Sequence, residues 1–433
     1  MRVRRTPVYS LFYTGHFILF GEQGSFKFIR YTQTILFAFS ALLLMLAVFN
    51  FSNNRKWAIW AGFLYGINIF VISYCFFTLT ESLSPFLIVS CIYLFSKYIK
   101  TGQTKFLIFT GISLGISFLC RPTSGVLFIG ILLYLLFYLY PFRLKLLYSY
   151  LFIIISFSAC LSPWVLRNYF LTGKIIVAEK YYHGATMDFG RAHIKLREIV
   201  GVWTNPANLS AEAFSSKLRN LVKVGNKENI DLHIEEYTEQ WPEFVFKTFS
   251  KEEIHSDLIA LGECYKVKSD ILNRNKDILR KELLNQECEF EVYNLLSEKK
   301  QALVNENFIR YWLITPLKTS FELIFNSTVH NFQVLTNLPG KFQVIGKGIT
   351  YIFNVTLYLC LFYFLFSKSV NLQLRLFVFA PVFILFISLT ALLFRYVESR
   401  YLLVTNPLLF ISFSYTVNDA HMYLNKFFKK RNE

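Results

Sequence analysis

Charged residues are scarce in this chain, and motifs of metal-dependent or nucleotide-dependent enzymes are missing from it. Only 17% of its 433 residues are charged, whereas 54% are hydrophobic, a balance that excludes an ordinary soluble protein. The sequence has no HExxH motif and no paired Cys/His spacing, so we expect no metal site. It has no Walker or GxGxxG loop either, so we expect no cofactor and no nucleotide-driven reaction.

The seven cysteines form no pattern typical of a disulfide framework or a metal site. Two of them, Cys264 and Cys288, lie in a polar region, where a bridge and two unpaired thiols both agree with the sequence. The other five lie in apolar segments and are predicted to be small core residues: Cys75, Cys91, Cys120, Cys160 and Cys360.

Long apolar runs dominate the sequence instead. They recur at lengths near or above the roughly 18 residues that cross a hydrocarbon core, and they are continuous, which favours helices over a β-barrel. The apolar segment 8–20 is shorter and is predicted to lie in the membrane interface. We predict an all-α polytopic membrane protein with about nine spans: 31–52, 57–77, 80–96, 106–120, 122–141, 146–165, 344–366, 376–394 and 401–417.

Basic residues sort by membrane side, which accounts for much of the net charge of +17 without a nucleic-acid partner. Every second short connection is basic, and these sides are predicted to be cytoplasmic, together with the C-terminus. The N-terminus and the long connection 166–343 are then extracytoplasmic, in a multi-pass protein of a bacterial inner or plasma membrane. The residues concerned are Arg55, Lys56, Lys97, Lys100, Lys105, Arg143, Lys145, Lys368, Arg375, Lys426, Lys429, Lys430 and Arg431.

These patterns divide the chain into a six-span bundle at 31–165, an extracytoplasmic domain at 166–343, a three-span bundle at 344–417 and a basic tail at 418–433. Within the long connection, apolar residues recur at helical spacing from about 251 to 310, with Lys, Glu and Asn on the other faces. We therefore predict amphipathic helices there.

Charged residues at the predicted extracytoplasmic edge break the positive-inside pattern. Charges at a span edge are costly unless they find partners or water, and several arginines on one side suggest an anion such as a lipid phosphate. Each residue also has a structural alternative, namely helix capping, snorkelling or a simple ion pair. The residues are Arg5, Arg30, Glu81, Arg121, Arg167, Arg395, Glu398 and Arg400.

Five motifs in this order resemble bacterial membrane glycosyltransferases of the protein-mannosyltransferase-like group, which includes the aminoarabinose transferase of lipid A. They are RTPVYSLFYTGHFILFGE, TESLSPFLIV, GISLGISFLCRPTSGVLF, SPWVLRNYFLTGK and ESRYLLVTNPLLF. The resemblance covers residues 1–170 and 343–417. It implies a type C glycosyltransferase fold that moves a hexose or pentose from a polyprenyl-phosphate donor to a lipid, glycan or protein acceptor of the cell envelope.

The resemblance also implies a site at the extracytoplasmic edge, in which Arg5 binds the donor phosphate and stabilises the charge that develops as the sugar departs. Tyr9 belongs to the same motif and Tyr401 follows Arg400. The donor-phosphate or substrate-binding candidates are Arg5, Tyr9, Arg30, Glu81, Arg121, Arg167, Glu398, Arg400 and Tyr401.

In the family, a first span and an acidic general base precede the motif that contains Arg5, whereas here Met1 comes first. We therefore expect residues 1–30 to be the remnant of an outer loop with its interfacial helix, and Glu81 is a weak substitute for the base. The alternatives are a truncated or degenerate family member that acts as a membrane partner, or a polysaccharide polymerase or transporter. Transport is disfavoured because the sequence has no internal repeat.

Overall fold

The computed structural model describes residues 6–178, 190–274, 283, 285–327, 339–392, 395 and 397–432, with side chains up to residue 425. Within these ranges the chain is helical and contains no strand, so the predicted all-α class is confirmed. The chain divides into two compact units. The membrane unit comprises residues 1–178, 323–385 and 399–433, and the second unit comprises residues 179–322 and 386–398.

Six helices among the described residues are long and apolar enough to cross a membrane, and a bent pair raises the number to seven. The predicted number of about nine is higher, because α5 (Thr104–Cys120) has only 17 residues and the segment 401–417 divides between a 3₁₀ turn, Ser399–Val404, and α19 (Asn406–Asn432). The candidate spans are Pro7–Ser52, Thr80–Thr101, Pro122–Leu139, Arg143–Thr172, Gly340–Phe366 and Leu372–Leu392, and the bent pair is Arg55–Gly66 with Ile69–Phe76.

The first helix, α1 (Pro7–Ser52), joins the predicted interfacial segment 8–20 to the predicted span 31–52. Its one non-helical residue is Gly21, at φ +68°, a conformation that other residues adopt at a cost. Pro7 stands in the first turn, where its missing N–H is tolerated. The two predicted segments are therefore consecutive helices that meet at a glycine break.

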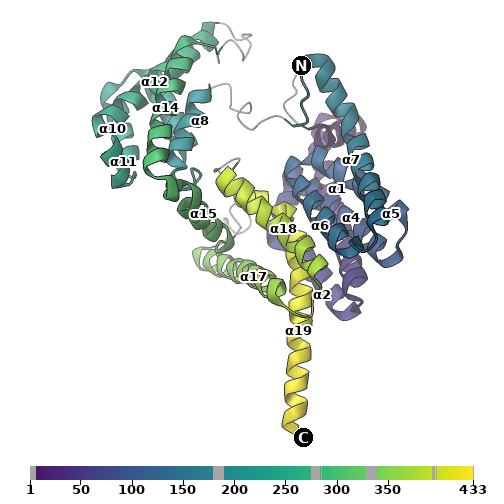
Figure 1. The fold of residues 1–433 in the computed structure, drawn as a ribbon. Coiled ribbons are helices and arrows are strands. Elements are labelled where there is room, and N and C mark those ends of the chain that lie inside the picture. The colour runs from purple at the N-terminus through teal and green to yellow at the C-terminus, as the bar shows by residue number, and fades with distance from the viewer. Residues whose placement is uncertain are drawn as a thin grey trace. The chain divides into compact units, whose positions relative to one another are not determined.

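Helices α1, α4 (Thr80–Thr101), α5 and α7 (Arg143–Thr172) pack on one another in the membrane unit, as Figure 1 shows. Small residues allow the close approach of α5 to α7, as is common between membrane helices. A Cβ atom added at Gly111 would lie 2.8 Å from the Ile153 carbonyl oxygen, and one at Gly115 would lie 2.6 Å from Cys160 Cβ. The unit also contains α2 (Arg55–Gly66), α3 (Ile69–Ile72), α6 (Val126–Leu139), α17 (Gly340–Phe366) and most of α18 (Leu372–Ile387).

The second unit is built from amphipathic helices, and the helices predicted between 251 and 310 are confirmed as α12 (Lys251–Arg274) and α14 (Glu287–Glu306). Leu258 and Leu261 of α12 and Leu296 and Leu303 of α14 lie in one hydrophobic core. The other helices are α8 (Gly190–Val200), α9 (Ala211–Val224), α10 (Lys227–Thr238), α11 (Glu243–Thr248) and α15 (Thr315–Ile324). All of these except α9 are labelled in Figure 1.

A disulfide bond joins Cys264 of α12 to Cys288 of α14. The structure thus selects the bridge from the two alternatives that the sequence left open. The five remaining cysteines are free, and all except the half-buried Cys160 are buried, as expected for small core residues.

Candidate functional site

The membrane unit contains a buried cluster of opposite charges around Glu81, in the first turn of α4. Arg121 Nη1 lies 3.3 Å from Glu81 Oε1, and Arg400 Nη1 lies 3.6 Å from the same oxygen. The Glu81 and Arg121 side chains are 6% and 7% exposed, and that of Arg400 is 30% exposed. The structure therefore brings together three residues that lie far apart in the sequence.

Local backbone structure explains how each charge reaches the cluster. Thr80 Oγ1 donates a hydrogen bond of 3.0 Å to Glu81 Oε2, and a carboxylate at this helix end is favoured by the helix dipole. Arg121 caps α5, and its N–H donates to the Ser117 carbonyl at 2.8 Å. Pro122 then begins a 3₁₀ turn. Glu81 and Arg121 thus lie at helix ends, and they also meet in one ion cluster.

Tyr401 packs against both arginines. Its ring centroid lies 5.3 Å from Arg121 Cζ and 5.6 Å from Arg400 Cζ, within the range of cation–π attraction. These contacts bring two guanidinium groups, one carboxylate and one aromatic ring together. In a mostly buried site of low dielectric, a guanidinium group attracts an anion more strongly than it would in water.

A buried glutamine connects Tyr9 to the start of α4. With the Gln33 amide in the orientation that satisfies both of its ends, its nitrogen donates to the Cys75 and Phe77 carbonyls at 3.0 and 3.1 Å. Its oxygen accepts from the Tyr9 hydroxyl at 3.1 Å and lies 2.8 Å from Ser82 Oγ, next to Glu81. The sequence analysis did not identify Gln33, which is fully buried in the structure. Its available signal was a polar residue inside an apolar helix, a position that often marks a functional or structural hydrogen bond in membrane proteins.

The remaining predicted site residues lie elsewhere or outside the described residues. Arg5 lies outside them. Arg30 is exposed on α1. Arg167 is half-buried, donates to Asn168 Oδ1 at 3.0 Å and lies 4.9 Å from the centroid of the Trp164 ring. Glu398 belongs to the second unit.

A cavity of about 170 Å³ lies in the membrane unit, where the bent α2–α3 pair, α17 and the start of α19 meet. Its walls are mainly apolar, and its polar groups include Asn68 and Asn406, which form a hydrogen bond of 3.1 Å with each other. Asn406 follows Arg400 by six residues, so the segment 399–406 contributes both to this cavity and to the ion cluster.

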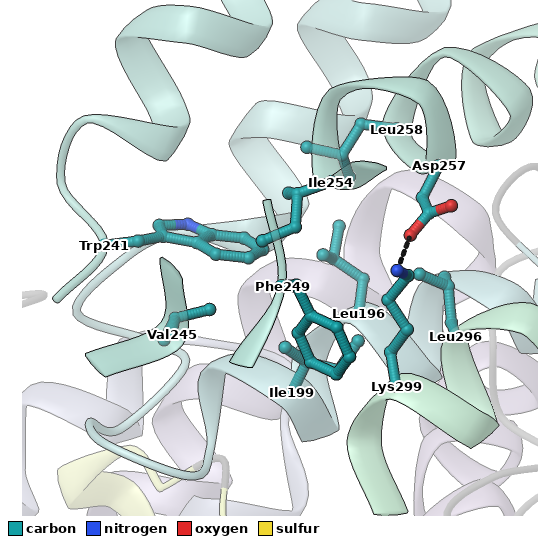
Figure 2. Close-up of a pocket in the computed structure, with 10 residues that line it drawn as sticks. All are labelled: Leu196, Ile199, Trp241, Val245, Phe249, Ile254, Asp257, Leu258, Leu296 and Lys299. Carbon is teal, nitrogen blue, oxygen red and sulfur yellow. Dashed lines mark ion pairs between the residues drawn. The ribbon is translucent and has the colours of Figure 1, made fainter. Parts of the chain in front are cut away.

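Figure 2 shows a second pocket, within the second unit, where Asp257 and Lys299 face each other at one edge and Trp241 lies on the other side. Lys299 Nζ lies 3.4 Å from Asp257 Oδ2. Burial raises the pKa of Asp257, and the Lys299 charge opposes this shift. The volume of about 10 Å³ is close to that of a single water site, so this pocket is a packing gap in the core.

No group of three or more His, Cys, Asp or Glu side chains within the described ranges could hold a metal ion. The fold and this site define a polytopic helical membrane protein with a mostly buried cluster of two arginines and one glutamate.

Residues 4–166 match the family model of dolichyl-phosphate-mannose-protein mannosyltransferases. The match supports a protein-mannosyltransferase-like family of membrane glycosyltransferases for this stretch, and the predicted resemblance is confirmed there. No curated protein and no solved structure matches the chain.

Proposed function

We propose that this chain transfers a sugar from a polyprenyl-phosphate donor to a lipid, glycan or protein acceptor. The observation that carries the proposal is the approach of two guanidinium groups to one carboxylate oxygen, at 3.3 and 3.6 Å, in a mostly buried cluster. The name of the matched family, which describes mannose transfer from dolichyl phosphate to protein, supports this substrate class.

The reaction breaks the bond between the sugar's anomeric carbon and the donor phosphate oxygen and forms a bond from that carbon to an acceptor oxygen. The acceptor's proton passes to a base, and the lipid phosphate leaves with increased negative charge. Arg121 and Arg400 stabilise that charge, because a fixed cation in a mostly buried site gains more energy as the charge develops. Guanidinium donors also match the geometry of phosphate oxygens.

Glu81 is then a positioning residue for the two arginines. Its Oε1 contacts the Nη1 atoms of both Arg121 and Arg400, at 3.3 and 3.6 Å, and so holds the two guanidinium groups beside each other. This assignment replaces the role of substitute base that the sequence suggested for Glu81. Arg5 remains a proposed donor-phosphate ligand on the strength of the motif alone.

The same proposal places the reaction and the second unit on the extracytoplasmic side of a bacterial inner or plasma membrane. The Cys264–Cys288 bridge supports this side, because disulfides persist in oxidising compartments. The basic short connections support the same orientation through the positive-inside rule.

The test uses the purified full chain in lipid nanodiscs, supplied with polyprenyl-phosphate hexoses and pentoses and with lipid, glycan and peptide acceptors. We expect transfer of at least one sugar, and Arg121→Ala is expected to lower turnover by about 100-fold or more, a loss typical of removing a group that stabilises developing charge. The closer isostere Arg121→Gln provides a second variant if Arg121→Ala does not fold.

Arg55→Ala is the matched control, since Arg55 is an exposed arginine at the start of α2. It is expected to leave turnover and thermal stability unchanged. Normal turnover in a folded Arg121→Gln protein would refute the role of the cluster. A folded, unsubstituted chain that transfers no sugar from any donor would support the non-catalytic partner instead.

A further inference from the structure

The second unit contains a helical segment, residues 308–321, whose solvent-facing side is apolar. It consists of the end of a helical stretch, a π-helical turn at Arg310–Ile314 and most of α15. Four apolar side chains at intervals of four residues are between 51% and 65% exposed: Ile309, Leu313, Leu317 and Phe321. Phe308 and Trp312 are also exposed.

The opposite side of this segment is buried and carries hydroxyl groups. Tyr311, Thr315 and Thr319, again at intervals of four, are only 3% to 7% exposed. Thr315 Oγ1 donates a hydrogen bond of 2.7 Å to the Val202 carbonyl within the unit. The exposed side of this segment is thus more apolar than that of a typical surface helix in water, which buries its apolar face and exposes its polar one.

Contacts within the unit connect this segment to the end of a membrane span. Residues 386–392 complete the candidate span Leu372–Leu392 and belong to the second unit. Arg395, three residues beyond that span, donates from Nη2 to the Tyr311 carbonyl at 2.8 Å, and its guanidinium lies 3.2 Å from the centroid of the Tyr311 ring. Because a span ends at the bilayer boundary, Tyr311 lies near that boundary as well.

We propose that residues 308–321 lie in the membrane interface, with Ile309, Leu313, Leu317 and Phe321 inserted among the lipid acyl chains. The partner of this surface is the lipid bilayer itself. The amphipathic ring of Trp312 suits the headgroup boundary, and Phe308 adds to the apolar face. Lys318, whose side chain is 59% exposed, lies between two inserted residues in sequence and extends its ammonium to the headgroups.

Insertion into the bilayer explains how the apolar side of residues 308–321 can be stable without a protein partner in the unit. Each large apolar side chain that enters lipid removes its apolar surface from water, which is favourable, so several such residues on one face bind the unit to the bilayer. The Lys318–Glu322 pair, 4.0 Å apart, stays in the polar layer. This inference depends on the second unit and its adjoining span alone and stands independently of the proposed sugar transfer.

The test is the depth of a nitroxide label at Leu317→Cys in the full chain, reconstituted in nanodiscs of phosphatidylcholine and phosphatidylglycerol. The label is expected to collide readily with oxygen, which partitions into lipid, and several-fold less with a water-soluble nickel chelate. Leu313→Cys is the second variant if the first does not fold. The unsubstituted chain, taken through the same labelling, gives the background from native cysteines.

Val224→Cys is the matched control, because Val224 is an apolar, 79% exposed residue at the end of α9 in the same unit. Its label is expected to favour the nickel chelate. Equal nickel accessibility at both positions would overturn the proposal in favour of a water-facing surface. A Leu317 label that neither reagent reaches would also overturn it, in favour of a protein partner such as a second copy of this chain.

Discussion

Among the described residues, the membrane unit buries two charged side chains, Glu81 and Arg121, and these form a pair with each other. The second unit buries five, in several separate places: Arg197, Asp257, Lys268, Glu289 and Arg395. The two units differ in how they distribute buried charges because their environments differ. Charges are expensive within a bilayer and tend to mark function there, whereas the helical second unit distributes them over local pairs and carbonyl contacts.

The pairs of the second unit illustrate this structural use of charge. Lys268 Nζ lies 2.5 Å from Glu289 Oε2, and both side chains are 1% exposed. Glu289 Oε1 also accepts from the N–H of Ala192 at 2.8 Å and from the N–H of Arg191, at the start of α8. One carboxylate therefore fixes three helices, α8, α12 and α14, without any feature of a substrate site.

The largest expected effect comes from Lys268→Ala, which leaves the Glu289 carboxylate buried without its cation. We expect the free energy of unfolding of the second unit to fall by about 3–5 kcal/mol. This loss is measured by chemical unfolding of the full chain, monitored through tryptophan fluorescence. Sugar transfer per folded molecule is expected to remain, because the pair belongs to the scaffold.

Lys217→Ala is the matched control for this prediction. Lys217 pairs with Glu236 at 3.5 Å, but both side chains are more than half exposed. Its loss is expected to cost no more than about 1 kcal/mol. Equal losses of unfolding free energy in the two variants would contradict the prediction that buried pairs stabilise this unit more than exposed ones. A folded Lys268→Ala protein that transfers no sugar would contradict the purely structural role of the Lys268–Glu289 pair.

Removal of the disulfide comes next in size. Cys264→Ser with Cys288→Ser opens a link across 24 residues of sequence, and we expect a loss of about 2–4 kcal/mol from greater freedom of the unfolded chain. Cys160→Ser, at a free and half-buried cysteine, controls for the substitution itself. Unchanged stability of the double variant would mean that the α12–α14 contact needs no covalent link.

The last expected effect is absent at neutral pH and grows as the pH falls: a pH dependence at His193, whose Nδ1 lies 2.9 Å from Ser215 Oγ. Burial, together with the charges of Arg197 and Lys268, lowers the pKa of His193 to about 3. Below about pH 6.5 the unfolded chain binds a proton at His193 that the folded unit does not bind. The contribution of neutral His193 to the free energy of unfolding is therefore complete above about pH 6.5 and declines as the pH falls towards 3.

Unfolding measured from pH 7 to pH 4 tests this dependence. The stability difference between the unsubstituted chain and His193→Gln should shrink by about 1.4 kcal/mol per pH unit below 6. A difference that is constant with pH would contradict the prediction, because it would mean that His193 binds its proton equally in the folded and unfolded chains.

Hydropathy and helical spacing predicted most of the helices but not where they break. The apolar stretch 57–77 reads as one span, yet Asn68 caps a new helix and the pair is bent by 42°. Its side chain accepts from the Phe70 N–H and donates to Asn406 Oδ1, a partner 338 residues away. Such a break depends on a distant hydrogen bond, which no local pattern contains.

The site was predictable where charge interrupts an apolar run, as at Glu81 and Arg121, because the cost of burial makes such residues conspicuous. Proximity in sequence was less informative. Glu398 and Arg400 are two residues apart but belong to different units. The cysteine bridge required the Cα–Cα distance of 5.5 Å, which only the packing of α12 on α14 establishes.

The second unit is discontinuous, and this has a consequence for the order of biosynthesis. Arg395, which donates to the Gly201 and Tyr311 carbonyls, emerges from the ribosome only after α17 and α18. A nascent chain that stops before these helices lacks the side chain that joins the two carbonyls, so these two contacts of the unit form only after the later spans have been synthesised.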